Sequence, residues 1–468
     1  MRWFVVALVA VVGCGSNGLP FPGAGGVGGT GSNPTQSPDM AFGEGGHGGG
    51  SGGHGGGSGV GGGGGGVGGG GGIGSGGGGG IAGGGGGGIA GGGGGGIGSG
   101  GGGGAGGGTD SPLFGGPSVI QLPAGYEGES TAIGDVTGDG RNDVVVGAWQ
   151  SGVSVDGTVV FVFAQLPSGA LDAPVMYAVV DSGALTPRSI ALGDLDGDGR
   201  LDVAVARLAD VGVLYQTAGG TLAPIVPLTV TQGGNGEELV AIADFNGDGR
   251  ADLVATGWAA NGIDLWLQGA DGTLAGPESF VCPHGGYDDI AVADFDGDGS
   301  SDLIIAGPQA TSGCLLQQSA GGFLPYVSLP YSEDVEAIAG GDVDGDGRPD
   351  FVAVGGGNGS DAHLGVALQA ADGTLGAFAW SASRDIPGDV IVGDADGDGR
   401  NDVLVLHTGW NELGVYLQSA AGVLGDEQIY PISYINWGAD RMAFGDINGD
   451  GRPDIVAADA GLTILLHR

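Results

Sequence analysis

A nine-residue acidic segment occurs seven times in this chain, and its spacing constrains the fold more than any other feature. The copies are DVTGDGRND, DLDGDGRLD, DFNGDGRAD, DFDGDGSSD, DVDGDGRPD, DADGDGRND and DINGDGRPD, beginning at residues 135, 194, 244, 294, 342, 394 and 446. Successive copies start about 50 residues apart, a period typical of repeat architectures. The chain is therefore expected to fold as seven similar units.

Short apolar segments flank every copy of the motif. SIALG, LVAIA and DIAVA precede motifs, VVVGA, LVAT and LIIAG follow them, and segments such as IDLWLQ and GVALQ come next, before a Gly-containing turn. These runs are continuous rather than alternating, which predicts strands buried on both faces. The residue before the first Asp is always Gly or Ala, as expected where strands crowd near an axis. Each unit therefore predicts four short strands, and we expect no helix.

Seven apolar four-stranded units predict an all-β fold, a seven-bladed β-propeller. The last unit stops after its third strand, LTILLHR (462–468), whereas LFGGPSVIQLP (113–123) precedes the first motif and looks like a fourth strand. An open array would leave sheet edges exposed. We therefore expect the N-terminal strand to complete the last blade and close the ring.

The motif has the composition of a calcium loop. Positions 1, 5 and 9 are always Asp, position 3 is Asp, Asn or once Thr137, and positions 4 and 6 are always Gly. Ca²⁺ takes six to eight oxygen ligands, which side chains at positions 1, 3, 5 and 9 and the carbonyl of position 7 can supply. Gly at position 6 permits the positive φ of a sharp loop. The alternative is a simple Asx/Gly turn, and Mg²⁺ is disfavoured because it prefers rigid, water-rich octahedral sites.

The expected metal ligands are the residues at positions 1, 3, 5, 7 and 9 of the seven copies. They are Asp135, Thr137, Asp139, Arg141 and Asp143; Asp194, Asp196, Asp198, Arg200 and Asp202; Asp244, Asn246, Asp248, Arg250 and Asp252; Asp294, Asp296, Asp298, Ser300 and Asp302; Asp342, Asp344, Asp346, Arg348 and Asp350; Asp394, Asp396, Asp398, Arg400 and Asp402; and Asp446, Asn448, Asp450, Arg452 and Asp454.

The seven copies in register resemble FG-GAP/VCBS repeats, the calcium-blade propellers of integrin alpha chains and many bacterial surface proteins. The resemblance covers about residues 112–468 and departs at Thr137, a neutral residue that predicts weaker binding in the first blade. It implies up to seven Ca²⁺ ions. Because clustered carboxylates repel one another until a cation relieves them, we expect these ions to be mainly structural.

The N-terminal segment predicts a secretion signal followed by a flexible linker. Arg2 and an apolar run from Trp3 to Val12 suit a signal-peptide core but are too short to span a bilayer as a helix. The sequence VVGC ending at Cys14 resembles a bacterial lipobox, which implies lipidation of Cys14; an ordinary secretory signal that contains a Cys is the alternative. Residues 1–13 are then a lipoprotein signal peptide, 14–110 a lipidated Cys and disordered Gly-rich linker, and 111–468 the calcium-binding propeller. We expect a bacterial envelope location, in the outer membrane facing the exterior or the periplasm.

The charge and the cysteines exclude some functions. A net charge of −41, with 12 basic residues that are all Arg, repels nucleic acid. Cys282 and Cys314 lack a zinc-site spacing. They are either a disulfide between neighbouring repeats or two buried thiols, and we expect thiols.

A ligand face is expected opposite the motif loops. Aromatic residues fall in the loops there, where they suit sugar stacking or a protein partner, or simply plug the loops between blades. The candidates are Trp149, Trp258, Trp410, Trp437, Tyr287 and Tyr331.

The sequence contains no recognisable catalytic constellation, so we expect a binding or adhesion module for an extracellular protein or glycan, working as a monomer. The alternatives are a polysaccharide-acting hydrolase or lyase that uses acids on the loop face, and an envelope-complex scaffold. The fold alone does not decide among them.

Overall fold

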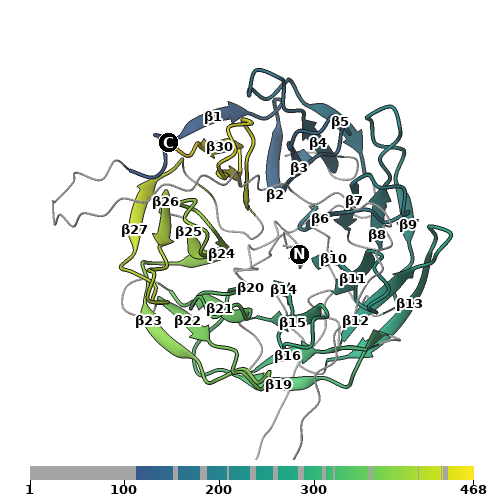
Figure 1. The fold of residues 1–468 in the computed structure, drawn as a ribbon. Helices are drawn as coiled ribbons and strands as arrows, with labels where there is room; N and C mark the ends of the chain where they lie inside the picture. The colour runs from purple at the N-terminus through teal and green to yellow at the C-terminus, as the bar shows by residue number, and fades with distance from the viewer. Residues whose placement is uncertain are drawn as a thin grey trace, which may run out of the picture. The chain divides into compact units, whose positions relative to one another are not determined.

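The computed structural model describes residues 112–150, 157–179, 187–207, 210–231, 239–256, 262–282, 289–307, 312–319, 322–357, 362–408, 410–433, 435 and 441–468. These residues form seven four-stranded antiparallel sheets arranged as the blades of a propeller (Figure 1). The described part of the chain contains no helix. The expected all-β seven-bladed propeller is therefore confirmed.

The first three blades each run outward in chain order. Blade 1 consists of β2 (Tyr126–Gly134), β3 (Asp143–Gln150), β4 (Val159–Phe163) and β5 (Val175–Ala178). Blade 2 consists of β6 (Ile190–Gly193), β7 (Asp202–Ala206), β8 (Val211–Leu214) and β9 (Val226–Leu228). Blade 3 consists of β10 (Leu239–Ala243), β11 (Asp252–Thr256), β12 (Gly262–Gln268) and β13 (Leu274–Val281).

The next three blades follow the same order. Blade 4 consists of β14 (Asp289–Ala293), β15 (Asp302–Ala306), β16 (Ser312–Leu316) and β19 (Val327–Pro330), with an added hairpin of β17 (Gln318–Ser319) and β18 (Gly322–Phe323). Blade 5 consists of β20 (Ala337–Gly341), β21 (Asp350–Gly355), β22 (His363–Ala367) and β23 (Ala379–Ala382). Blade 6 consists of β24 (Pro387–Gly393), β25 (Asp402–His407), β26 (Glu412–Tyr416) and β27 (Gln428–Pro431).

Blade 7 closes the ring with strands from both ends of the propeller. It consists of β28 (Met442–Gly445), β29 (Asp454–Ala458), β30 (Gly461–Leu465) and β1 (Ser118–Gln121). Strand β1 pairs antiparallel with β30, from Ser118 opposite Ile464 to Gln121 opposite Gly461. The N-terminal strand therefore supplies the missing fourth strand, as the sequence predicts.

The hydrophobic core lies between the blades. Each of seven apolar clusters joins residues of two adjacent blades, including blades 7 and 1, where Ile133 and Val456 belong to one cluster. The continuous apolar runs of the sequence follow from this arrangement, because both faces of a blade contact a neighbour.

The small residue before each motif also has a packing reason. A Cβ on Gly193 would overlap Ile242 of the next blade, and a Cβ on Gly445 would lie 3.0 Å from Cγ2 of Ile133, across the closure. Innermost strands therefore approach so closely that the last residue before the loop must be small.

Cys282 is disulfide-bonded in this structure. The expectation of a free thiol is therefore wrong for this residue, which lies fully buried in the cluster between blades 3 and 4. Residues of two neighbouring blades meet in this cluster, so a buried cysteine there is placed for a cross-link. The side chain of Cys314 lies outside the described part of the chain.

Candidate metal centres

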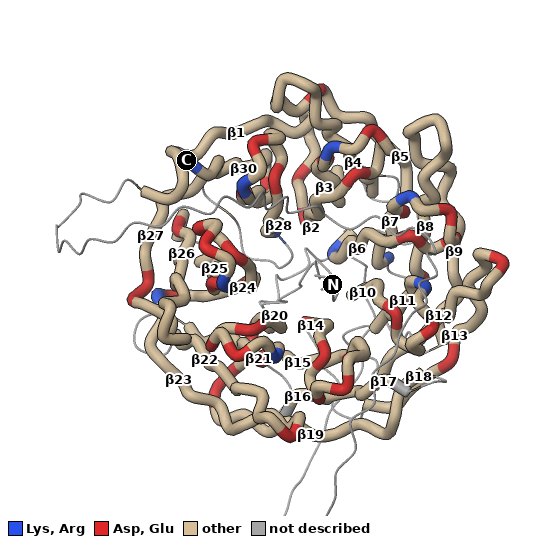
Figure 2. Tube along the Cα trace, in the orientation of Figure 1, with Lys and Arg blue, Asp and Glu red and all other residues tan. Residues whose placement is uncertain are grey.

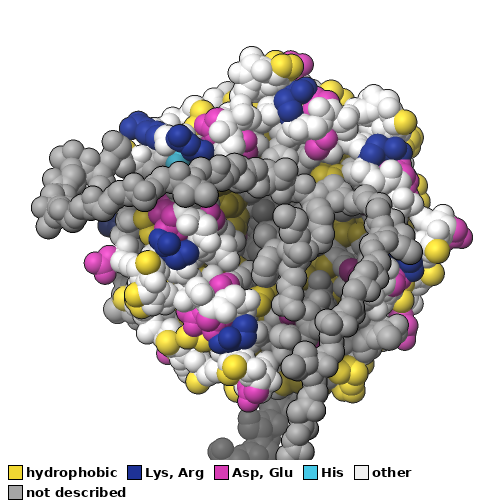
Figure 3. Space-filling model, in the orientation of Figure 1, with side chains coloured by type: hydrophobic (Ala, Val, Ile, Leu, Met, Phe, Trp, Pro, Cys, Tyr) yellow, Lys and Arg dark blue, Asp and Glu magenta, His cyan; other side chains and the backbone are white. Residues whose placement is uncertain are grey.

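The seven motif loops join the first and second strands of their blades. In Figure 2 acidic stretches and arginines recur around the ring, and Figure 3 shows the same face with arginine side chains beside acidic ones. Because every loop leaves its blade at the equivalent strand end, all seven gather on one face of the propeller. The repeat therefore creates seven equivalent sites around a ring.

The carboxylate at position 1 shapes the loop. In blade 2, Oδ1 of Asp194 accepts hydrogen bonds from the backbone N–H groups of Gly197 (2.7 Å) and Asp198 (3.0 Å), and Oδ2 accepts one from Gly199 (2.8 Å). Gly197 and Gly199 have φ of +74° and +84°, which a side chain would strain. The two glycines of the motif are thus required by the turn that wraps the first Asp.

Positions 1, 3 and 9 bring carboxylates together. In four blades these residues each offer an oxygen, and the three oxygens lie within 4.8 Å of one another. The four groups are Asp194, Asp196 and Asp202; Asp294, Asp296 and Asp302; Asp342, Asp344 and Asp350; and Asp394, Asp396 and Asp402. They are the four copies with Asp at position 3, because Thr137, Asn246 and Asn448 replace that acid in the other three blades.

The position 9 carboxylate is buried and ties the loop to the blade. In blade 2, Asp202 is fully buried; its Oδ2 accepts the N–H of Leu195 (2.9 Å) and its Oδ1 the N–H of Gln216 (2.7 Å). Burial, reinforced by the neighbouring carboxylates of Asp196 and Asp194, raises the pKa of Asp202 to about 7. The corresponding Asp in the other six blades has a pKa raised to about 6 or 7, again chiefly by burial. A cation beside these carboxylates would offset that unfavourable burial.

Positions 5 and 7 are arranged differently from the other predicted ligands. The Asp198 carboxylate forms an ion pair with the Arg200 guanidinium, whose Nε donates to the carbonyl of Gln216 (3.1 Å). The same pairing of position 5 with position 7 occurs in blades 1, 3, 5 and 6. The acid groups therefore contain positions 1, 3 and 9. The position 5 carboxylate instead contacts the arginine side chain of position 7, a residue that the sequence analysis considered only for its backbone carbonyl.

The donor set fits a hard cation. It consists of carboxylates at positions 1, 3 and 9, with Asn in place of the third-position acid in blades 3 and 7. Oxygen-only ligands around a loop with two positive-φ glycines suit Ca²⁺ rather than zinc or copper, which take nitrogen or sulfur ligands. Thr137 gives blade 1 a hydroxyl at position 3, so its loop, like those of blades 3 and 7, has one acid fewer than the loops of blades 2, 4, 5 and 6.

Sequence comparison places these loops in a known repeat family. The profile of the FG-GAP-like repeat matches residues 194–255, 244–305, 294–353, 342–405 and 394–457, which together span more than half of the chain. The chain belongs to the FG-GAP-like repeat family. The motif at 135–143, the copy with Thr at position 3, precedes the matched FG-GAP region. No curated protein sequence matches the chain.

Three solved structures resemble this chain at low sequence identity. The BBS1N chain of a complex with ARL6DN is 12% identical, with a TM-score of 0.50, covering 76% of this chain and 96% of that one. A lectin from Agrocybe aegerita, described as recognising non-reducing terminal N-acetylglucosamine, is 22% identical, with a TM-score of 0.49 and coverage of 65% and 80%. A rhamnogalacturonan lyase from Bacillus licheniformis is 15% identical, with a TM-score of 0.45 and coverage of 75% of each chain.

The aromatic candidates for a ligand face have separate surroundings. Trp149 donates its indole N–H to Glu129 (2.8 Å), Tyr331 donates its hydroxyl to the carbonyl of Gly307 (3.0 Å), and Trp410 is 48% exposed. Trp258, Trp437 and Tyr287 lie outside the described residues. Trp149 is therefore held within the closure between blades 7 and 1, and only Trp410 of the described three presents a largely exposed ring.

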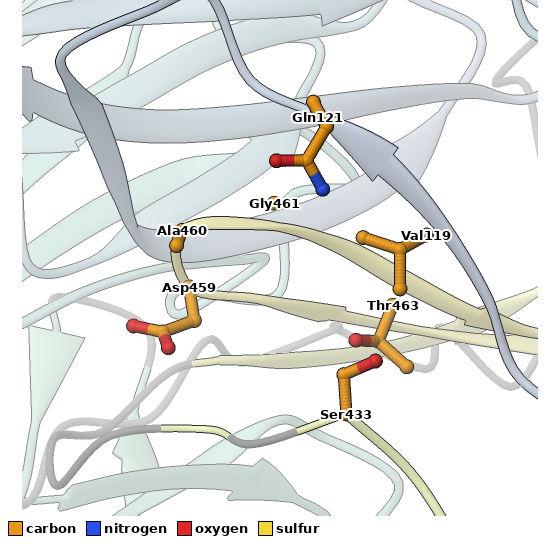
Figure 4. A pocket seen from close by; sticks show the side chains of 7 residues that line it. All are labelled: Val119, Gln121, Ser433, Asp459, Ala460, Gly461 and Thr463. Carbon is orange, nitrogen blue, oxygen red and sulfur yellow. The ribbon is translucent and has the colours of Figure 1, made fainter.

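Two hollows lie away from the motif loops. One, of about 280 Å³, is lined by residues of β1, β30 and their surroundings, including Gln121, Asp459 and Thr463 (Figure 4). The other, of about 520 Å³, lies beside blade 5 and is lined by Glu333, Asp334, His363, Trp380 and neighbouring small residues. His363 contacts the carbonyl of Asp334 through Nε2 (2.8 Å) and meets Trp380 edge to face.

Sequence reasoning missed a glutamine that ends the third strand in blade 3 and follows it by two residues in blades 2, 5 and 6. Gln216, Gln268, Gln369 and Gln418 each donate Nε2 to the backbone carbonyl of the first Asp in the preceding blade. The recurrence of Gln at one place in the repeat was the signal that could have identified it.

In addition, no described helix is long and apolar enough to cross a membrane.

Proposed function

We propose that this FG-GAP propeller is a calcium-stabilised, lipid-anchored surface module that binds an extracellular protein or carbohydrate. The observation that carries the metal part is the convergence of three carboxylates within 4.8 Å in each of four blades. Three acids at that separation repel one another strongly unless a cation lies among them. Binding of Ca²⁺ to the folded loops therefore stabilises the propeller by mass action.

Thermal unfolding of the full chain tests the structural role of calcium. Excess Ca²⁺ should raise the melting temperature well above the value in EDTA, whereas Mg²⁺ should have a smaller effect because it favours rigid octahedral sites. The substitution D196N removes one acid of the blade 2 group and should reduce the calcium-dependent rise. An identical melting temperature with Ca²⁺ and with EDTA would exclude a structural calcium.

The anchor is proposed from the lipobox-like sequence that ends at Cys14. A lipid on this residue, followed by a Gly-rich linker, holds the propeller at a bacterial envelope membrane. Labelling of the expressed chain with a fatty-acid analogue should mark the wild type and not C14S. Equal labelling of both proteins would remove the anchor from the proposal while leaving the calcium sites unaffected.

The binding role is supported by the hollow beside blade 5. Trp380 supplies an aromatic wall, Glu333 and Asp334 supply acceptors, and the cavity of about 520 Å³ has room for a sugar residue or a peptide side chain. A glycan array probed with the full chain, with and without Ca²⁺, tests the carbohydrate option, and W380A is the variant expected to lose any signal. Retained binding by W380A would place the ligand elsewhere.

We favour a binder over a hydrolase or lyase because the acids of the motif are engaged structurally. Position 1 holds backbone N–H groups, position 5 pairs with arginine in five blades, and position 9 joins the loop to the third strand. Release of soluble sugar from an acidic polysaccharide by the purified chain would overturn this choice.

A further inference from the structure

Four glutamines each contact two motif loops at once. The backbone N–H of Gln418 donates to Oδ1 of Asp402 in its own blade (2.7 Å), and its side-chain Nε2 donates to the carbonyl of Asp342 in the preceding blade (3.3 Å). Gln369 joins Asp350 (2.8 Å) to Asp294 (2.7 Å) in the same way. The other two bridges are Gln216, between Asp202 (2.7 Å) and Asp135 (3.2 Å), and Gln268, between Asp252 (2.8 Å) and Asp194 (2.7 Å).

The turn after each bridging glutamine also rests on the preceding loop. A Cβ on Gly422 would overlap the backbone carbonyl of Asp344, the third motif residue of blade 5, and a Cβ on Gly373 would overlap that of Asp296 in blade 4. Both glycines have positive φ, +70° and +83°. A loop that changes shape in one blade must therefore displace both the glutamine and the turn of the next blade.

Hydrogen bonds within its own blade do not explain why the bridging residue carries an amide side chain. The Oε1 atoms of Gln216, Gln369 and Gln418 are buried and accept no hydrogen bond within the described part of the chain. A buried amide oxygen without a hydrogen-bond donor is unfavourable relative to an apolar side chain of the same shape. The amide is therefore retained at this place against a local penalty, and its one side-chain bond goes to the motif loop of the neighbour.

We propose that the four glutamines act as a relay that transmits calcium occupancy from the motif loops of blades 1, 2, 4 and 5 to the blade that follows each of them. This inference rests on the proposed binding of Ca²⁺. An ion among positions 1, 3 and 9 of blade 5 fixes the carbonyl of Asp342, which fixes Gln418 and so the N–H that orients Asp402 in the loop of blade 6. Occupancy of one site thus raises the affinity of its neighbour, and the glutamine is a positioning residue for two metal loops.

The chain contains a matched position without the bridge. Gln165 in blade 1 also donates its backbone N–H to the ninth motif residue, Asp143 (3.0 Å), but its buried Nε2 donates to no atom of the described residues. The carbonyl of Asp446 in blade 7 instead accepts a bond from Asn142 (3.1 Å). The relay through glutamine is therefore interrupted between blades 7 and 1, and Gln165 is the control for the other four.

Calcium titration of the chelator-treated full chain by calorimetry tests the relay. Methionine replaces the amide at similar length, so Q418M and Q369M should bind as many ions as the wild type, with a shallower isotherm and a midpoint raised about fivefold, the effect of losing one coupled hydrogen bond. Q165M should overlay the wild type. Circular dichroism in excess Ca²⁺ establishes that each variant is folded.

A second comparison separates the relay from simple weakening. D344A, which leaves no side-chain oxygen at position 3 of the blade 5 loop, should remove one ion and weaken a second in the wild-type background, but remove only one ion in the Q418M background. Calcium isotherms of Q418M and Q369M that coincide with that of a calcium-binding wild type would overturn the relay and leave the proposed function intact. A wild type that binds no Ca²⁺ would overturn both.

Discussion

The guanidinium of Arg441 lies 3.0 Å from the carboxylate of Glu129, across the closure where blade 7 meets blade 1. Arg441 is 3% exposed and also donates to Asp459 (3.2 Å) and to the carbonyl of Gly128 (3.1 Å). Glu129 accepts the indole N–H of Trp149 as well, and burial raises its pKa. The ring is therefore closed by a buried polar network in addition to the pairing of β1 with β30.

Removing the cation from this network should destabilise the propeller. R441M leaves two carboxylates without their partner, and breaking a buried ion pair typically lowers the free energy of unfolding by about 3–5 kcal/mol. Urea denaturation followed by tryptophan fluorescence measures the change. The matched control is R384M, because Arg384 pairs with Glu412 at the surface and such pairs contribute about 0–1 kcal/mol. Equal effects of the two substitutions would contradict the importance of the closure network.

Blade 1 offers a gain of metal binding. T137D places an acid at position 3, beside Asp135 and Asp143, and so reproduces the group found in blades 2, 4, 5 and 6. The added carboxylate should tighten calcium binding at this loop about tenfold, because an additional charged ligand strengthens the site. Calorimetry should show one additional tight ion relative to the wild type. T229D, at an exposed residue that follows the outermost strand of blade 2, should leave the calcium isotherm unchanged.

Asp389 predicts a dependence of stability on pH. Burial raises the pKa of this carboxyl to about 7, although it accepts the N–H of Met442 in the next blade (3.1 Å). The Asp389 carboxyl binds its proton more tightly in the folded state than in the unfolded chain, so protonation stabilises the fold. This contribution to the free energy of unfolding is fully present below about pH 4 and is lost as the pH rises to about 7. The sign is opposite to that of a salt-bridged Asp.

Urea denaturation at pH 5 and pH 8 in excess Ca²⁺ measures this effect while the motif carboxylates stay bound. Between pH 5 and pH 8 the free energy of unfolding of the wild type should fall by about 2–3 kcal/mol more than that of D389N, because the asparagine amide cannot ionise. D426N, at an exposed residue, should behave as the wild type does. A pH profile of D389N parallel to that of the wild type would assign the dependence to other groups.

A glycine in blade 6 holds open the space for a buried histidine. His407 is 1% exposed and contacts Glu427 through Nε2 (2.8 Å), and a Cβ on Gly414 would overlap Oε1 of Glu427 and lie 2.9 Å from that Nε2. G414A should therefore lower the free energy of unfolding by about 1–3 kcal/mol, the usual range for overpacking a core. Differential scanning calorimetry compares it with G357A, where an added Cβ meets no atom within 4 Å. A G414A melting temperature at or above that of G357A would refute this packing argument.

The sequence predicted those parts of the fold that depend on repetition and strand patterning. Seven motifs and continuous apolar runs predicted seven blades, and an unpaired third strand at Leu462 together with an unassigned strand at Val119 predicted the closure. Each inference rested on a rule that acts locally along the chain, since a buried strand requires a partner on each side.

The details of the sites depend on side-chain contacts within loops, between strands and between blades, which no strand pattern contains. In blade 2 the position 5 carboxylate pairs with Arg200 of the same loop, and Gln268 reaches Asp194 because blades 2 and 3 pack against each other. Glu129, the hydrogen-bond partner of Trp149, lies 20 residues away in the sequence and is brought beside it by the pairing of β2 with β3.

The closure by β1 also determines how the propeller responds to force. Any tension carried along the chain from its N-terminal side reaches the propeller at residues 113–115, shortly before β1, where the N–H of Leu113 donates to the hydroxyl of Tyr430 (3.3 Å). Phe114 is buried against Tyr430 and His467, and the N–H of Gly115 donates to the carbonyl of Leu466 (2.8 Å). A pulling force must extract the Phe114 side chain before it can separate the four residue pairs of β1 and β30 one after another. The β1–β30 pairing is therefore the first part of the propeller to break under tension, and the other six blades bear force only after β1 has detached.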